Sequence, residues 1–182
     1  VAPFLHLPIQ SGCTQTLRRM GRPYSAETLL ANVDAIRDIL PSVSISCDLI
    51  VGFPGETDEE FARTLEACRK IGFSRMHVFR YSKRPGTPAA TAPNQVDPKV
   101  MAARSARVRR LAEQMARQDA ESRIGSVENA VFEYEDKGTL GSFHKVIIED
   151  APAGMRGAIA PVRIVSLDDD GYLHARLVDY QS

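Results

Sequence analysis

The chain has 182 residues, of which 43% are hydrophobic and 25% charged, and its 23 basic and 23 acidic side chains leave a formal net charge of zero. This composition is typical of a soluble globular protein of one or two domains. No apolar run reaches the length of a membrane span, and the start "VAPFLHLPIQ" lacks the features of a signal peptide. Three widely spaced cysteines without a CxxC pair fit a reduced, cytoplasmic protein better than a disulfide scaffold.

The charges are distributed unevenly along the chain. Residues 1–123 carry eighteen basic and thirteen acidic side chains, whereas residues 124–182 carry five and ten. Such a contrast suggests two modules with these boundaries. The sequence does not start with Met and opens within a predicted strand, so we expect it to be a fragment of a longer protein.

Strands alternate with helices in the first module. The strand "PFLHLPIQ" precedes a helix capped by Ser25, and the strand "SVSISCDLIV" precedes a helix that begins with a capping box of Thr57 and Glu60 and ends at Gly72. "SRMHVFRYS" is a third strand, and a long helix follows over 98–123. This order predicts a parallel sheet with right-handed crossovers, whose strands end at the same edge.

The pattern changes after residue 125. Four alternating segments, "ENAVFEYE", "SFHKVIIED", "IAPVRIVSL" and "YLHARLV", are separated by turn signals such as "DKG" and "DDDG". We therefore expect a small β barrel or sandwich.

The second strand has one apolar and one polar face. A parallel strand covered by helices on both sides would be apolar on both, so the alternation favours an α/β fold that is a partial barrel, with helices outside and a polar lumen. His6 and Gln10 face the lumen by the same rule, and the orientation of the third strand is ambiguous. The alternative is an open α/β sheet with exposed strand faces. The apolar face is Val43, Ile45, Cys47, Leu49 and Val51, and the polar face is Ser44, Ser46, Asp48, Ile50 and Gly52.

Three motifs in order resemble the later part of the radical S-adenosylmethionine (SAM) methylthiotransferases. They are "HLPIQSG" (6–12), "DLIVGFPGET" (48–57) and "FRYSKRPGTPAA" (79–90), and the spacer "LRRMGRPYS" (17–25) is also similar. The resemblance covers residues 1 to 123 and implies the C-terminal part of a partial (β/α) TIM-like barrel. The β segments of 124–182 resemble the small, OB-like, RNA-binding TRAM domain that ends these enzymes.

The resemblance implies residues that bind SAM. Backbone groups around Ile50 would contact the adenine, and Gly52 would let the ligand approach the strand tip closely. Gln10 and Ser11 match positions that would bind the ribose or the amino-acid end of the cofactor. An ordinary βα turn, a buried amide or core packing would use the same residue types. The predicted cofactor-binding residues are Gln10, Ser11, Asp48, Ile50, Gly52, Glu56, Phe79 and Tyr81.

The family also uses 4Fe-4S clusters, one of them held by a CxxxCxxC loop and another by an N-terminal domain. No three cysteines of this chain share a loop, as cluster ligation requires. We therefore predict no catalytic or metal-ligating residues, and expect the chain to be inactive without the missing N-terminal domains of its parent. His6 and His77 fit satisfied core residues better than metal ligands, and Cys13 is interpreted as a small substitution rather than a nucleophile.

Basic residues suggest that the partner is tRNA. Residues 67–96 contain six basic and no acidic side chains, and Lys83 and Arg84 directly follow the third strand, where they could contact phosphates. The basic residues of the long helix are interpreted mainly as a solvated face. In the acidic second module a local patch around Lys137, Lys145 and Arg163 could bind RNA, with Phe143 and His144 as stacking surfaces. The predicted RNA-binding residues are Lys83, Arg84, Lys137 and Lys145.

The stretch "IGFSRMHVFRYSKRPGTPAA" is most similar to the branch that methylthiolates threonylcarbamoyladenosine in tRNA, next to the anticodon. The branches that act on isopentenyladenosine or on a ribosomal protein are alternatives. Two hypotheses of other classes are a non-catalytic RNA-binding or interface fragment and an unrelated barrel enzyme such as an aldolase or isomerase. The latter predicts a lysine on an inward strand face, and none occurs in the three strands.

Overall fold

The computed structural model describes residues 2–178, and the chain divides into two compact units. Among these residues, an α/β unit contains 6–41 and 45–116, and a β unit contains 2–5, 42–44 and 117–178. Residues 179–182 of the second predicted module lie outside the described residues. The division falls within the long helix rather than after residue 123, and a second module of residues 124–182 stays a prediction.

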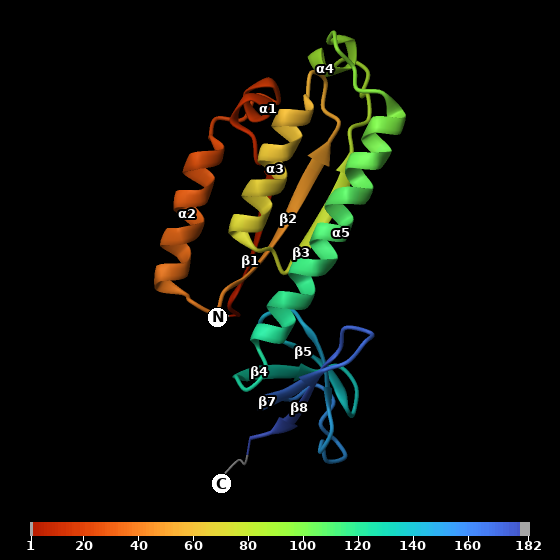
Figure 1. Ribbon diagram of the computed structural model, residues 1–182. Helices are drawn as coiled ribbons and strands as arrows, with labels where there is room; N and C mark the ends of the chain where they lie inside the picture. Colours follow the sequence, from red (N-terminus) through yellow and green to blue (C-terminus); the bar gives the residue numbers. More distant parts are fainter. Residues whose placement is uncertain (1, 179–182) are drawn as a thin grey trace. The chain divides into compact units, whose positions relative to one another are not determined.

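Three strands and their connecting helices build the α/β unit (Figure 1). The strand order is β1-β2-β3, β2 and β3 pair in parallel, and β1 runs the same way (Figure 1). Alternating strands and helices are therefore confirmed as parallel βα units. In chain order the elements are β1 (Phe4–Gln10), α1 (Thr14–Arg19), α2 (Ala26–Ile39), β2 (Ser44–Val51), α3 (Asp58–Ile71), β3 (Arg75–Arg80), α4 (Pro88–Thr91) and α5 (Pro98–Ser122).

Local signals fix the ends of α2 and α3. The hydroxyl of Ser25 accepts a hydrogen bond from the N–H of Thr28, as an N-cap does. Thr57 and Glu60 form the predicted capping box, and Gly72 ends α3 in the left-handed conformation, with φ at 64°. None of the helices within residues 2–178 has the length and apolar character required to cross a membrane.

The alternation in β2 separates a core face from an open face. The side chains predicted to be apolar are all buried, and the buried side chains of α3 complete this core. Helices α2 and α3 lie side by side over one face of the sheet (Figure 1). On the other face Asp48 and Ile50 are half-buried, whereas Ser44 and Ser46 near the start of the strand are buried, so this face is open only toward its carboxyl end. The buried residues of β2 and its N-terminal neighbour are Val43, Ile45, Cys47, Leu49 and Val51.

The structure resolves the ambiguous orientation of β3. Val78 is buried, whereas His77 and Phe79 are exposed. In the parallel register His77 lies opposite Asp48, and Phe79 lies opposite Ile50. Because neighbouring residues in register point to the same side of a sheet, both aromatic side chains belong to the open face.

The β unit contains a closed five-stranded barrel with strand order β4-β5-β6-β8-β7. A barrel rather than a sandwich is therefore the correct alternative for this segment. Its core consists of small and branched apolar side chains around Phe132. The strands are β4 (Val127–Phe132), β5 (Lys137–Leu140), β6 (Lys145–Ile148), β7 (Ile159–Leu167) and β8 (Leu173–Leu177).

Three elements escaped the sequence analysis. Helices α1 and α4 have only six and four residues, too few for a clear helical period. The interpretation of "DKG" as a turn is wrong, because Lys137 and Gly138 lie in β5. Glycine is needed there, since a Cβ on Gly138 would lie 2.2 Å from the carbonyl oxygen of Val131 in the paired strand β4.

Candidate functional site

The three strands of the α/β unit end at the same edge of the sheet, near α1 and the loop that leads to α4 (Figure 1). β1 ends at Gln10, and Val51 at the end of β2 lies opposite Arg80 at the end of β3. The prediction of a common edge is confirmed. Parallel α/β folds bind ligands at the carboxyl ends of their strands, so a site is expected first at this edge.

The open face presents an apolar pair close to this edge. Ile50 of β2 is half-buried, and Phe79, its partner in register, is 53% exposed. One step further from the edge, the register pairs Asp48 with His77. An aromatic ring beside a branched aliphatic side chain offers a flat apolar surface, and polar groups border it. This combination suits a planar heterocycle with polar substituents.

His6 extends the polar border onto β1. Its Nδ1 lies 2.8 Å from Ser46 Oγ and its Nε2 lies 3.3 Å from Asp48 Oδ2, so both ring nitrogens have partners. The rings of His6 and His77 are 6.0 Å apart between centroids. Interpreting the two histidines as core residues is wrong, because both are exposed. The described residues contain no group of three or more His, Cys, Asp or Glu side chains that could hold a metal ion.

Two glycines shape the turn after β2. Gly52 has φ at 75° and Gly55 has φ at 79°, both in the left-handed region that side chains disfavour. A Cβ on Gly52 would lie 2.1 Å from Cγ of Met101 on α5, so α5 packs directly against this backbone. The N–H of Gly55 donates to the carbonyl oxygen of Asn94 (2.8 Å), which secures the turn from the other side.

Glu56 is buried behind the turn rather than on the open face. Its Oε1 accepts hydrogen bonds from the N–H of Gly52 (2.9 Å) and from Nη1 of Arg104 (2.6 Å). Burial raises the pKa of Glu56, and the Gly52 N–H and the Arg104 guanidinium oppose this effect. The carboxylate is thus occupied within the chain, and its contribution to ligand binding would act through the turn.

The side chains of Gln10 and Ser11, at the end of β1, have different surroundings. Gln10 has φ at 64°, a strained conformation for a side-chain-bearing residue, and its Nε2 donates to the carbonyl oxygen of Pro8 (3.3 Å). Ser11 is buried, with its Oγ 3.2 Å from Thr64 Oγ1 of α3 and accepting from the N–H of Cys13. The side chain of Gln10 thus folds back on its own strand, whereas the hydroxyl of Ser11 ties the loop to α3.

Tyr81 lies directly after β3. Its ring packs edge-on against Phe53 of the glycine turn, with 5.2 Å between centroids. The Tyr81 hydroxyl is buried and has no hydrogen-bond partner among the described residues. Such an unpaired polar group is uncommon in folded proteins and fits a position where a ligand completes the hydrogen bonding. Phe53 was not singled out from the sequence.

The family model for the "Radical SAM superfamily" matches residues 2–68, which include β1, the glycine turn and most of α3. A threonylcarbamoyladenosine tRNA methylthiotransferase of Thermotoga maritima is 38% identical over 178 residues, or 97% of this chain and 41% of that protein. The chain is thus similar to the radical SAM methylthiotransferases over most of its length.

Other relatives of this methylthiotransferase-like chain carry a different substrate in their names. A tRNA-2-methylthio-N(6)-dimethylallyladenosine synthase of Acidothermus cellulolyticus is 48% identical over 127 residues, or 70% of this chain and 26% of that protein. The chain thus spans 26% and 41% of the lengths of these two relatives. Coproporphyrinogen III oxidase of Escherichia coli, a radical SAM enzyme, superposes with a TM-score of 0.52 at 24% identity, covering 62% of this chain and 27% of that one. This likeness supports the fold alone.

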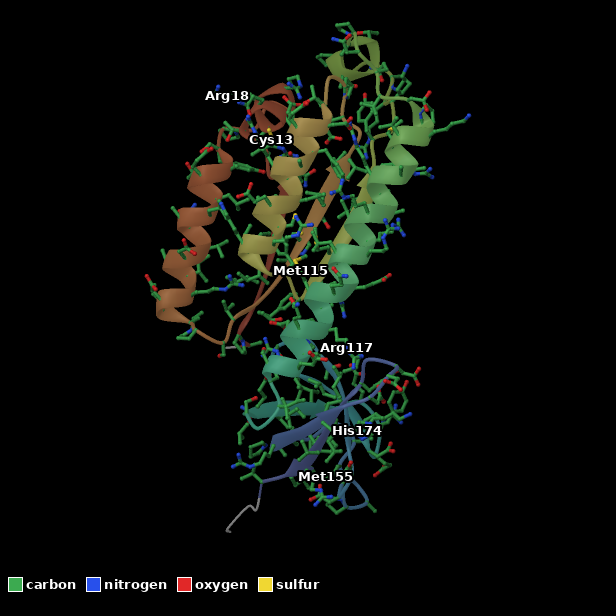
Figure 2. The ribbon with its side chains drawn as sticks, viewed as in Figure 1. Cys13, Arg18, Met115, Arg117, Met155 and His174 are labelled. Carbon is green, nitrogen blue, oxygen red and sulfur yellow. The ribbon has the colours of Figure 1, made fainter. Side chains whose placement is uncertain are left out.

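The three cysteines of the methylthiotransferase-like chain do not fit an iron–sulfur cluster. Cys13 lies at the start of α1 (Figure 2), Cys47 in β2 and Cys68 in α3, and all three are buried. Burial raises the pKa of Cys47 strongly and that of Cys68 to about 12, which disfavours the thiolate that binds iron. The described residues therefore do not supply a set of cluster ligands.

The predicted RNA-binding residues differ in their surroundings. Lys83 and Arg84 are exposed in the loop after β3. In the barrel Lys137 is exposed at the start of β5, whereas Nζ of Lys145 pairs with Glu133 Oε2 at 2.9 Å. Glu133 consequently has a lowered pKa, because Lys145 stabilises its charged form. The charge of Lys145 is thus partly satisfied within the barrel.

The proposed stacking surfaces of the β unit also have partners. Phe143 is 48% exposed and stacks on Phe4, with ring centroids 4.2 Å apart. His144 Nε2 lies 3.1 Å from Asp119 Oδ2. A base could reach only the remaining exposed part of the phenyl ring.

Arg104 of α5 is an exception to the expectation that the basic residues of the long helix form a solvated face. Arg104 is only 7% exposed, and Val108, Leu111 and Met115 follow it as buried residues. These positions share one face of a helix with 3.6 residues per turn. An arginine at a position that the helical period assigns to the apolar face could have indicated a buried ion pair from the sequence.

Proposed function

We propose that this chain is the C-terminal part of a radical SAM tRNA methylthiotransferase and that its β2 tip binds the adenosyl part of SAM. The observation that carries the proposal is the open face, where Ile50 and Phe79 adjoin in register next to a glycine turn. The matches to the radical SAM family and to methylthiotransferases support it. On this proposal the full-length protein is a cytoplasmic enzyme, and its other domains lie outside the present sequence.

The residues of the chain would bind and orient the cofactor. Ile50 and Phe79 would hold the adenine face, and Gly52, whose Cα is covered by Met101 of α5, would shape the turn beside it. Gln10 and the unpaired Tyr81 hydroxyl would bind polar groups of the ribose or the amino-acid end. SAM with a reducing cluster supplies the radical chemistry, and the protein supplies position and exclusion of water.

The Asp48, His6 and His77 cluster would face the substrate deeper in the lumen. Asp48 has one oxygen near His6 Nε2, and His77 lies opposite it in register. Both histidines can donate or accept hydrogen bonds at the edge of a purine base. These side chains would orient the modified adenosine without taking part in the hydrogen transfer.

The proposed substrate is threonylcarbamoyladenosine next to the anticodon of tRNA. The Thermotoga maritima relative named for this nucleoside matches 97% of the chain. Lys83 and Arg84, exposed at the end of β3, would contact the tRNA backbone. Lys137 would add a phosphate contact from the barrel, and Lys145 could do so by exchanging Glu133 for phosphate.

A chimeric enzyme tests the proposal. Residues 2–178 replace the matching segment of the Thermotoga maritima relative, and the chimera is expressed in a bacterial strain without its own methylthiotransferases. Mass spectrometry of tRNA nucleosides then reports which adenosine gains a methylthio group. We expect methylthiolated threonylcarbamoyladenosine, and no product from a chimera in which Ile50→Asp places a charge against the adenine.

Two other outcomes are informative. Product on dimethylallyladenosine alone would keep the enzyme class and replace the proposed nucleoside. A folded chimera with reconstituted clusters that modifies neither nucleoside would overturn the proposed function. The matched control is Ile39→Asp, because Ile39 is 79% exposed at the end of α2 and lies outside the site.

A further inference from the structure

Arg104 of α5 reaches into the turn that follows β2. Its Nη1 donates to the backbone oxygen of Glu56 at 3.0 Å and to Glu56 Oε1 at 2.6 Å, and its Nη2 donates to Asp58 Oδ1 at 2.7 Å. The guanidinium also lies 5.4 Å from the ring centroid of Phe61. It therefore fastens the segment between the glycine turn and the first turn of α3.

Glu56 connects this contact to the strand tip. Oε1 of Glu56 accepts one hydrogen bond from Arg104 and a second from the N–H of Gly52. Met101, three residues before Arg104 on the same helix face, packs against Gly52 itself. α5 thus reaches the Gly52 backbone in two ways, through a relayed ion pair and through direct van der Waals contact.

Stability alone is a weak reason to bury this ion pair. The side chains of Arg104 and Glu56 are 8% and 1% exposed, so both charges have lost most of their hydration. Replacing such pairs by apolar side chains is often neutral or stabilising. Charge-assisted hydrogen bonds are short and directional, however, so the pair defines a geometry closely.

The geometry points to Arg104 as a positioning residue that, through Glu56, holds the Gly52 backbone in its ligand-binding conformation. The inference rests on the proposed function, which places the adenosyl group at the β2 tip. Arg104 does not itself face the open side of the sheet. Glu56 consequently belongs to the site as a support of the turn and not as a ligand contact.

Two measurements on the full 182-residue chain test this role. One is the affinity for SAM by calorimetry, and the other is the hydrogen-exchange rate of the Gly52 amide by NMR. For Arg104→Met we expect affinity to fall and Gly52 exchange to rise by about tenfold each, the equivalent of one charge-assisted hydrogen bond. Arg104→Lys, which keeps the charge but not the planar fork, should give smaller changes of the same sign.

The matched control is Arg107→Met. Arg107 also lies over the Phe61 ring, at 5.9 Å, but is exposed and has no hydrogen bond to Glu56. We expect this variant to keep the wild-type affinity and the wild-type exchange rate at Gly52. Equal effects of the two substitutions would show a general loss of helix packing and would overturn the positioning role.

Further outcomes separate the inference from the proposed function. If the wild-type chain binds no SAM, the proposed cofactor site loses its support, and Gly52 exchange alone decides the inference. The positioning role is overturned if the Gly52 amide of a folded Arg104→Met chain exchanges at the wild-type rate. It is also overturned if core amides such as that of Leu65 exchange faster by the same factor as Gly52. If that variant does not fold, Glu56→Gln is measured instead, and unchanged Gly52 exchange there has the same meaning.

Discussion

Replacing Gly52 by alanine should destabilise the α/β unit through two separable effects. At φ of 75° a side-chain-bearing residue costs about 1–2 kcal/mol. The new Cβ would also lie 2.1 Å from Cγ and 2.6 Å from Sδ of Met101, and such overpacking typically costs about 1–3 kcal/mol. We therefore expect Gly52→Ala to lower the free energy of unfolding by about 2–5 kcal/mol.

Urea unfolding followed by circular dichroism measures this loss, and two variants divide it. Gly21 has a similar φ of 71°, but no heavy atom lies within 4 Å of the position that a Cβ would take there, so Gly21→Ala reports the conformational cost alone. Combining Gly52→Ala with Met101→Ala should recover the steric part, because the shortened side chain vacates the space. Equal losses for Gly52→Ala and Gly21→Ala would refute close packing of α5 on the turn.

Three further predictions concern other parts of the chain. Gly138→Ala should disrupt the β4–β5 pairing, since its Cβ would meet the Val131 carbonyl oxygen, and thermal unfolding should show a loss of about 2 kcal/mol or more. Burial acts to raise the pKa of Asp119, but its bonds to His144 and a neighbouring arginine prevail and lower it. The stability that the charged Asp119 contributes is complete above about pH 4 and is lost as pH falls through the lowered pKa. The difference in free energy of unfolding between wild type and Asp119→Asn should therefore shrink in acid, and a difference that stays constant with pH would contradict this. With its pKa raised to about 12, Cys68 should resist a thiol reagent at pH 8 until the chain is unfolded, and rapid labelling of the native chain would refute its burial.

Much of the candidate site was predictable from β2 alone. The alternation of Ser44 to Asp48, continued by one further step of two, placed Asp48 and Ile50 on the open face, and the glycines marked the turn at its end. Ser11 shows the limit of this reasoning. It follows the strand in sequence, yet its hydroxyl is turned to Thr64, which is 53 residues away along the chain.

The sequence by itself determined the features that depend on neighbouring residues. The caps of α2 and α3, the βα order and the two faces of β2 all follow from interactions within a few positions of the chain. The tertiary structure decided which way β3 faces, that Lys137 to Leu140 pair as a strand, and that Arg104 is buried against Glu56. Each of these depends on a partner distant in sequence, and a local pattern carries no information about which distant partner will be brought into contact.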